Sequence, residues 1–255
     1  MSDSLLKMPN YFRLALSDAP DRTVALTSFR DFYAFQQHVQ TCRRRRGLEM
    51  LPQWYDFPVF YFSNASSLVG HEAEVYAPVG CQELDYELEL GLVIGKPGRD
   101  IQVEDAWDHV LGFTIVNDFS ARDLQRAEMV VGLGPAKGKD FATAVGPTVV
   151  PLASVKDRID QAGRIDLAMK ATVNQRVLSL GNAKDMHFTW PELIQRASAD
   201  TMLNVGDLLG SGTVGTGCIL ELGPETTGGW LKPGDEIQLE IELLGQLKNP
   251  VVARP

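Results

Sequence analysis

Three acidic side chains alternate with apolar residues in one short stretch of the sequence. Asp85, Glu87 and Glu89 lie within the apolar run 84–94, and strict alternation predicts a β-strand with all three carboxylates on one face. Side chains two residues apart on a strand lie about 7 Å apart, so neighbouring carboxylates repel by about 2–3 kcal/mol at an effective dielectric constant of about 20. A divalent cation between them would remove this repulsion. The alternative is an edge strand whose acidic face lies in water.

A further acid ends a second apolar segment. Asp118 follows residues 112–117, and the acidic strand itself continues into the apolar residues 91–95. Apolar runs of this kind are typical of buried strands. Acids at the ends of buried strands favour a binding site over a solvated edge.

The elements that must position these acids are mostly strands. Helices are predicted over 31–46, 103–110 and 190–198, with a short helix after Asp118. Strands are predicted over 59–62, 74–76, 84–94, 112–118, 147–151, 165–173 with a hairpin turn at 174–175, 218–222 and 236–244. Because strands and helices do not alternate regularly, the pattern predicts an α+β fold, mostly β, with a largely antiparallel sheet system.

Composition limits the classes of partner and the compartment. The chain has 255 residues, of which 44% are hydrophobic, and no linker divides it, so one main domain is expected. A net charge of −9 argues against nucleic acid or an anionic membrane as the main partner and favours a small molecule. There is neither a signal-like N-terminus nor a run of 18 apolar residues, so we expect a cytoplasmic protein.

The cysteines and the glycine-rich segment exclude several common sites. Cys42, Cys81 and Cys218 are odd in number and widely spaced, so neither a disulfide framework nor a thiolate zinc site is indicated. Residues 132–140 resemble a phosphate loop, but the positions of its first glycine and its Ser/Thr are not matched. A Rossmann fingerprint and a GxSxG elbow are also absent from the sequence.

Five segments, taken together and in order, resemble motifs of the fumarylacetoacetate hydrolase family. They are DFY at 31–33 with His38 following, LDYELE at 84–89, NDFSARDLQ at 117–125, GPAKGKDF at 134–141 and GTVGTG at 212–217. The resemblance implies the mixed β-sandwich roll of the fumarylacetoacetase C-terminal domain. On this basis residues 31–255 are expected to form the catalytic domain, preceded by a short N-terminal segment, 1–30.

The resemblance also implies a set of metal ligands. Asp31, Glu87, Glu89 and Asp118 would bind one divalent cation, and their hard oxygen atoms suit Mg²⁺, Mn²⁺ or Ca²⁺ rather than Zn²⁺. On its own, Asp31 would be interpreted as a helix N-cap, so its role as a ligand rests on the family. Asp85 shares the strand face but is not a family ligand, and we expect a supporting role for it.

A catalytic set is implied in the same way. The resemblance pairs His38 with Glu221 for the activation of water, and it assigns the stabilisation of an oxyanion to Arg122, Gln125 and Lys139. In the predicted helix His38 lies two turns after Asp31, about 10 Å along the axis, where it could reach the rim of the site. A surface histidine is the alternative.

Substrate contacts are expected from Tyr33, Arg46, Tyr61 and Thr213. Arg46 ends the run Arg43–Arg46, whose simplest interpretation is a solvated helix end that complements the helix dipole.

Family members act on 2-oxo or diketo acids, in which a chelated cation polarises a carbonyl group. We therefore expect a metal-dependent hydrolase that cleaves a C–C bond in a 1,3-diketo acid, and a homodimer by resemblance. The alternative is an oxaloacetate decarboxylase or a 2-oxo acid hydratase or isomerase on the same scaffold.

Overall fold

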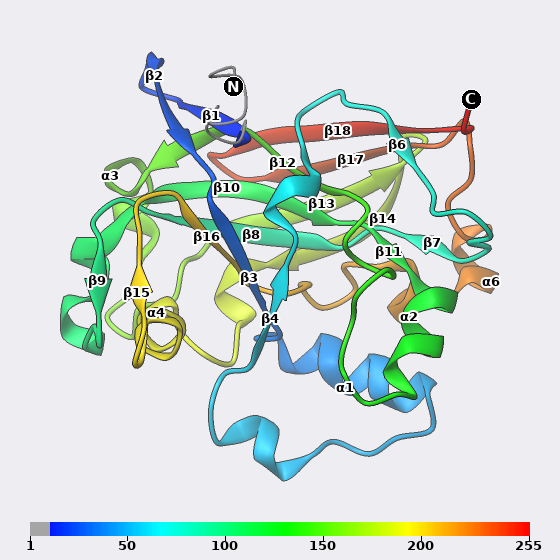
Figure 1. Cartoon of the computed structure of the whole chain (residues 1–255), viewed down its shortest axis with the longest axis horizontal. Helices are drawn as coiled ribbons and strands as arrows, with labels where there is room; N and C mark the ends of the chain where they lie inside the picture. The colour runs from blue at the N-terminus through cyan, green and yellow to red at the C-terminus, as the bar shows by residue number, and fades with distance from the viewer. Residues whose placement is uncertain (1–10) are drawn as a thin grey trace, which may run out of the picture.

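Two β-sheets form the framework of the molecule (Figure 1), and the computed structural model describes residues 11–255. The nine-stranded sheet contains β1 (Arg13–Leu16), β2 (Ala19–Ala25), β3 (Ser28–Phe32), β4 (Phe60–Ser63), β5 (Leu68–Val69), β8 (Leu88–Ile94), β10 (Val110–Asp118), β12 (Thr143–Pro151) and β16 (Asp207–Gly210). Its order is β2-β1-β12-β10-β8-β16-β3-β4, with β5 paired to β12. Most pairs are antiparallel, whereas β1–β12, β5–β12 and β3–β16 are parallel.

The second sheet has five strands in the order β14-β13-β17-β18-β6. Its strands are β6 (Val75–Tyr76), β13 (Ala168–Val173), β14 (Arg176–Asn182), β17 (Glu236–Ile241) and β18 (Gly245–Val252). Two short ribbons pair β7 (Leu84–Asp85) with β11 (Ser120–Ala121) and β9 (Gly98–Arg99) with β15 (Met202–Leu203).

Short helices complete the fold. The α-helices are α1 (Gln36–Arg45), α2 (Arg122–Met129), α3 (Leu152–Val155), α4 (Trp190–Ser198), α5 (Ile219–Leu222) and α6 (Pro224–Thr227). The 3-10 helices are Pro52–Tyr55, Ala65–Ser67, Val103–His109, Lys156–Arg158 and Ala183–Asp185. None of the helices within residues 11–255 is both long and apolar enough to cross a membrane.

The core lies between the two sheets, where β10 and β12 contact β17 and β18. Strand β8 is buried along its whole length. Its residues Leu88, Leu90 and Leu92 belong to the core between the sheets, whereas Val93 packs in a second core on the other face. Burial on both faces explains why this strand is apolar. The predicted β-sandwich architecture is therefore confirmed.

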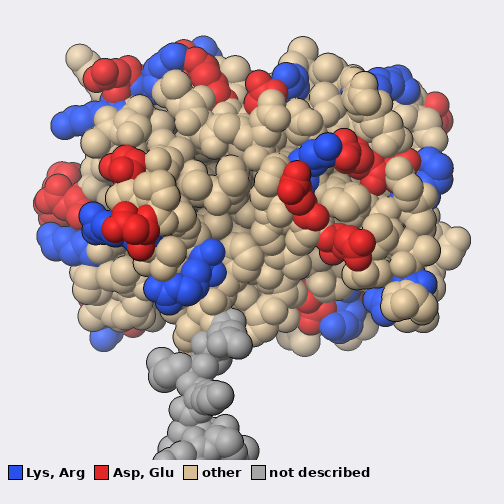
Figure 2. All heavy atoms as spheres, turned by 90° about the horizontal axis from the view of Figure 1, so that it is seen from above, with Lys and Arg blue, Asp and Glu red and all other residues tan. Residues whose placement is uncertain are grey.

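The charged side chains on the face shown in Figure 2 are mixed in sign. Lys and Arg lie among Asp and Glu, and neither sign forms one continuous patch on that face. The expected absence of nucleic-acid and membrane partners remains a prediction.

The first predicted helix is wrong at its start. Asp31 belongs to β3, where it pairs with Gly210 of β16 and with Tyr61 of β4, and α1 begins only at Gln36. Backbone pairing on both sides of β3 thus determines the conformation of Asp31, which a single-segment pattern does not reveal. The expected boundary between segments 1–30 and 31–255 falls inside this strand.

Two predicted strands also differ. The expected strand 84–94 is divided into β7 and β8, because β7 pairs with β11 whereas β8 pairs with β10 and β16. Residues 219–222 of the expected strand 218–222 form the single helical turn α5. A short apolar run has no decisive periodicity, so this segment could not be assigned from its pattern.

Candidate active site

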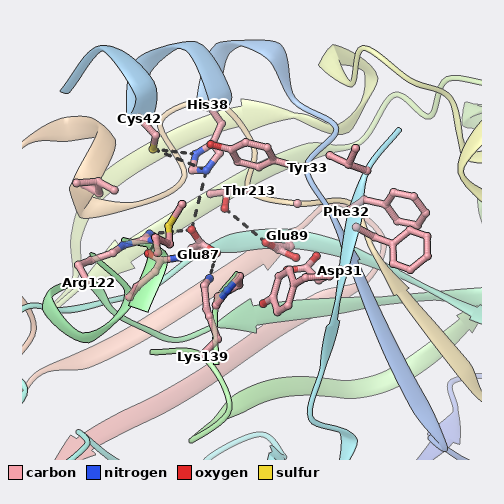
Figure 3. Close-up of a pocket in the computed structure, with 18 of the residues that line it drawn as sticks. Asp31, Phe32, Tyr33, His38, Cys42, Glu87, Glu89, Arg122, Lys139 and Thr213 are labelled. Carbon is pink, nitrogen blue, oxygen red and sulfur yellow. Dashed lines mark hydrogen bonds and ion pairs between the residues drawn. The ribbon is translucent and has the colours of Figure 1, made fainter. Parts of the chain in front are cut away.

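Three carboxylates from three strands of the large sheet meet at one point, and Figure 3 shows two of them, Asp31 and Glu89. Asp31 comes from β3, Glu89 from β8 and Asp118 from the end of β10, and one oxygen of each lies within 4.8 Å of the other two. All three side chains are buried. The sequence placed two of them at strand positions, and the structure brings all three together.

Two of these carboxylates, Asp31 and Glu89, lie next to Gly210. Asp31 Oδ1 and Glu89 Oε2 are buried and have no hydrogen-bond partner. A Cβ atom on Gly210 would lie 2.3 Å from Asp31 Oδ1 and 3.0 Å from Glu89 Oε2, so both oxygens face the volume that glycine leaves open. Buried acceptors without donors are costly. A hard divalent cation fits this oxygen set and would satisfy both atoms.

The electrostatics of these carboxylates agree with that fit. Burial raises the pKa of Glu89 well above its usual value, and the neighbouring Asp31 and Glu87 raise it further. Burial, followed by the charge of Asp118, likewise raises the pKa of Asp31. Without a cation the cluster therefore favours protonation, whereas a cation would stabilise the ionised form.

Glu87, the fourth expected ligand, lies beside these three carboxylates and forms ion pairs with two positively charged side chains. Arg122 Nη2 donates to Glu87 Oε1 over 2.7 Å, and Lys139 Nζ donates to Glu87 Oε2. Burial opposes the charge of Glu87, but Lys139 and Arg122 outweigh it and hold the pKa of this carboxyl far below its usual range. Glu87 thus remains ionised next to the cluster.

Asp118 is held by three further donors. Tyr61 Oη donates to Asp118 Oδ2 over 2.5 Å and Lys139 Nζ donates to the same oxygen over 2.6 Å, while Thr143 Oγ1 donates to Oδ1 over 3.2 Å. Tyr61 reaches Asp118 from β4, the edge strand of the sheet. These contacts place Tyr61 and Lys139 against the carboxylates, and Thr143 was missed by the sequence analysis.

An imidazole–carboxylate pair lies above the carboxylates. His38 of α1 has its Nδ1 3.0 Å from Glu221 Oε1 of α5, and its Nε2 is 4.0 Å from Glu87 Oε1. Burial lowers the pKa of His38, but the Glu221 carboxylate outweighs that effect and raises the pKa well above its usual value. Glu221 is oriented in turn by the backbone N–H of Thr216. The predicted pair is therefore in contact.

Asp85 connects the two helices that carry these groups. It accepts hydrogen bonds from Arg122 Nε over 2.8 Å and from the backbone N–H groups of Ile219 and Leu220 over 2.7 and 3.0 Å. It thereby fixes the first residue of α2 and the start of α5, which carries Glu221. The expected supporting role of Asp85 agrees with this geometry.

One cavity of about 310 Å³ joins most of these groups, a volume near the lower limit of ordinary ligand pockets. Eleven of the thirteen residues singled out in the sequence line it, whereas Asp118 and Glu221 lie behind other side chains. Those eleven are Asp31, Tyr33, His38, Arg46, Tyr61, Glu87, Glu89, Arg122, Gln125, Lys139 and Thr213. Cys42 and Arg43 also line the cavity and were not singled out.

The remaining substrate candidates have specific contacts. Tyr33 packs edge-on against the His38 ring with the centroids 5.4 Å apart, and Thr213 Oγ1 donates to Glu89 Oε1 over 3.4 Å. Gln125 Oε1 accepts from Arg122 Nη1 over 3.1 Å. Arg46 Nε donates to the Cys42 carbonyl over 3.1 Å.

A buried cluster of acidic oxygens with an adjacent imidazole base, set in this sandwich, defines the class of protein. The family model described as fumarylacetoacetate (FAA) hydrolase C-terminal matches residues 27–252. The chain belongs to the fumarylacetoacetate hydrolase family, and the family predicted from the motifs is confirmed.

Several curated relatives are named oxaloacetate tautomerases. The chain is 38% identical over 172 residues to oxaloacetate tautomerase YisK of Bacillus subtilis, covering 66% of this chain and 52% of the relative. It is 38% identical over 197 residues to the human mitochondrial oxaloacetate tautomerase FAHD2A, covering 76% of this chain and 59% of the relative. The alignments thus span little more than half the length of these relatives.

Solved structures share the fold. A fumarylpyruvate hydrolase from Pseudomonas aeruginosa, crystallised with Mn²⁺ and pyruvate, superposes with a TM-score of 0.78 at 23% identity, covering 98% of this chain and 99% of that one. A 2-hydroxyhepta-2,4-diene-1,7-dioate isomerase from Mycobacterium marinum gives 0.69 at 27% identity, covering 91% and 76%. The first match shows the fold alone.

Proposed function

We propose that the protein is a divalent-cation-dependent enzyme that interconverts the keto and enol forms of a 2-oxo dicarboxylic acid of the oxaloacetate type. The observation that carries the proposal is the position of His38 Nε2, 4.0 Å from Glu87 Oε1 and in the same cavity as the unpartnered oxygens of Asp31 and Glu89. The curated relatives support the same choice of reaction, since two of them are named oxaloacetate tautomerases.

Asp31, Glu89 and Asp118 would hold the cation, with Glu87 beside them. When bound, the cation would polarise the carbonyl of a 2-oxo acid and stabilise negative charge on its oxygen. Lys139 and Arg122 place two positive charges next to this position through their contacts with Glu87. Buried, pre-oriented cations stabilise developing negative charge more strongly than solvent does.

His38 is the residue we assign to proton transfer. Nδ1 lies 3.0 Å from Glu221 Oε1, and we assign proton transfer to Nε2, which lies 4.0 Å from Glu87 Oε1 in the cavity lining. In the proposed reaction Nε2 removes a proton from the carbon next to the carbonyl and then delivers it to the enolate oxygen, which gives the enol. The negative charge of Glu221 stabilises the imidazolium between these two steps.

The rim of the cavity suggests a substrate with a second carboxylate. Arg43 and Arg46 both line it, at the end of α1 away from Asp31 and Glu89. Guanidinium groups bind carboxylates in a bidentate manner. One carboxylate at the cation and another at these arginines would orient a short dicarboxylate across the cavity.

Hydrolysis of a C–C bond is the second candidate. The contact between His38 and Glu221 favours it, because such a pair could activate water for attack on a ketone. This was the main expectation from the sequence. The same residues serve both reactions, so the products distinguish them.

A parallel assay tests the proposal. The purified protein is supplied with Mg²⁺, Mn²⁺ or EDTA; enol-oxaloacetate decay, CO₂ release and the loss of acylpyruvates are then followed separately. We expect cation-dependent tautomerisation of oxaloacetate without stoichiometric CO₂. If the protein cleaves an acylpyruvate into pyruvate and an acid without tautomerising oxaloacetate, it is the hydrolase and the proposal is wrong. If CO₂ release from oxaloacetate is the only reaction, the protein is a decarboxylase.

The His38→Ala variant tests the assigned base. Loss of a general base lowers turnover by about 10²–10⁴-fold, while binding of Mn²⁺ should persist because His38 is not among the three oxygen ligands. His109→Ala is a matched control, because that partly exposed ring contacts the Lys96 carbonyl beyond the end of β8 opposite Glu89 and does not line the cavity. Full activity of His38→Ala would disprove the assignment.

A further inference from the structure

A second group of metal-ligating side chains lies next to the carboxylates. His38, Cys42 and Cys218 are all buried, and one ligand atom of each lies within 4.8 Å of the other two. His38 and Cys42 are one helical turn apart on α1, so they share a face of this helix. Cys218 is supplied by the residue that precedes α5. Figure 3 shows Cys42 directly beside the His38 ring.

The separations suit a single small ion. Cys42 Sγ lies 3.8 Å from His38 Nε2. In a tetrahedral zinc site, with Zn–S of about 2.3 Å and Zn–N of about 2.0–2.1 Å, neighbouring sulfur and nitrogen ligands are about 3.6 Å apart. Side-chain adjustments of a few tenths of an ångström would therefore give bonding distances.

Glu221 prepares the imidazole for this role. Its Oε1 lies 3.0 Å from His38 Nδ1. Histidine ligands commonly donate their second N–H to a carboxylate, which fixes the tautomer and directs the other nitrogen to the metal. Cys42 Sγ lies 3.8 Å from both ring nitrogens, and Nδ1 already contacts Glu221, so Nε2 is the nitrogen we assign to the ion.

The cluster is reachable from the cavity. His38 and Cys42 both line it, so an ion entering the cavity meets one nitrogen and one sulfur before Cys218. Two thiolates and one imidazole leave a fourth tetrahedral position for water or another ligand. Soft ligands of this kind prefer Zn²⁺ or Cd²⁺, whereas the oxygen cluster around Glu89 prefers hard cations.

We propose that His38, Cys42 and Cys218 form a second, soft-metal site that binds one Zn²⁺ or Cd²⁺ ion. Binding releases the two thiol protons and, where His38 is protonated, the proton on its ligating nitrogen as well; no other bond changes. The sequence analysis did not indicate a thiolate zinc site, because Cys42 and Cys218 are separated by most of the chain. A consequence, which rests on the proposed function, is inhibition: an ion on Nε2 prevents His38 from transferring protons.

Cobalt absorption tests the site directly. Co²⁺ bound to thiolates gives an intense sulfur-to-cobalt charge-transfer band and visible bands of tetrahedral geometry, whereas Co²⁺ bound to oxygen ligands gives neither. The titration is carried out with excess Mg²⁺, which occupies the oxygen cluster. The protein used is Cys81→Ser, because the chain has three cysteines and this variant retains only Cys42 and Cys218 as thiols.

We expect the charge-transfer band to saturate at one Co²⁺ per chain, to be displaced by one equivalent of Zn²⁺, and to vanish in Cys81→Ser/Cys42→Ser and in Cys81→Ser/Cys218→Ser. Loss of one thiolate should weaken Zn²⁺ binding by about 100-fold or more. A Cys81→Ser protein without the band would overturn the site. This result needs no core substitution, so it holds even if the double variants fail to fold.

Inhibition is measured separately. Zn²⁺ should inhibit the wild-type protein and Cys81→Ser alike, and it should inhibit Cys42→Ser at least about 10-fold more weakly relative to that variant's own rate. If Co²⁺ binds through sulfur but no reaction is catalysed, the proposed function fails and the metal site stands. If the enzyme is active but the sulfur band is absent, the metal site fails and the proposed function stands.

Discussion

Glu89 is a buried carboxylate that lies close to other carboxylates. It is fully buried, and burial together with Asp31 and Glu87 raises its pKa. Glu89→Gln should therefore abolish Mn²⁺ binding in calorimetry and also abolish turnover, because a neutral amide is a poor ligand for a hard cation. In EDTA the same variant should unfold at a higher temperature than the wild-type protein, since glutamine needs neither a buried charge nor the proton that Glu89, with its raised pKa, must take up on folding.

Exposed Glu104 provides the control for that substitution. Glu104→Gln makes the same chemical change without altering the oxygen cluster, so its Mn²⁺ affinity should equal that of the wild-type protein. Wild-type affinity in Glu89→Gln would show that this carboxylate is not a ligand.

Gly210 allows the cation volume to be blocked without any change in charge. Because an added Cβ would approach Asp31 Oδ1 to 2.3 Å, Gly210→Ala should lower Mn²⁺ affinity by about 10-fold or more, as other close perturbations of metal sites do. Calorimetric titration measures this. Gly70→Ala, whose methyl would meet only the Phe12 ring at 3.2 Å, should bind Mn²⁺ normally. Equal affinities in both variants would place the cation elsewhere.

Part of this residue set could be predicted from the pattern alone. Glu87, Glu89 and Asp118 stood out because acids are unusual in buried strands. Asp31 needed the family resemblance, since its neighbours in β16 and β4 are far away in the sequence. Gly210 could not be identified, because its importance is the absence of a side chain at a place where two distant strands meet.

At the scale of elements, Asp85 is the connection between α2 and α5. Asp85→Asn replaces an acceptor oxygen by an NH₂ group facing Arg122 or the Ile219 and Leu220 N–H groups. Breaking one side of a buried charge pair should destabilise the fold by about 3 kcal/mol. Urea unfolding measures this loss. Exposed Asp105→Asn is the control and should lie within about 0.5 kcal/mol of the wild-type protein.

Element boundaries were predictable where local signals are strong. The α4 helix occupies the predicted range 190–198, because Thr189 and Glu192 form a capping box and an apolar face follows. The start of α1 was not predictable, since Phe32 and Phe35 continue its apolar spacing although Phe32 lies in β3. Strands β1 and β18, absent from the sequence-based assignment, pair with distant strands, β1 with β12 and β18 with β6.

At the scale of the whole molecule, the expected homodimer is still a proposal. β4 is an edge strand, and its residue Phe62 is 72% exposed. Exposed edges and apolar side chains are commonly covered by partners. Light scattering should give twice the chain mass of 28.1 kDa. The mass of a single chain at micromolar concentration would disprove the dimer.

The oxygen cluster should also couple cation binding to the stability of the entire fold, because β3, β8 and β10 each contribute one of its carboxylates. An ion that binds only the folded chain adds about 2.7 kcal/mol at a concentration of 100 times its Kd. For a chain of this length, that corresponds to a rise in Tm of roughly 5–10 °C. Thermal unfolding with increasing Mn²⁺ should follow this dependence, EDTA should reverse it, and Glu89→Gln should show no shift. A Tm independent of Mn²⁺ in the wild-type protein would mean that the three strands do not share a cation.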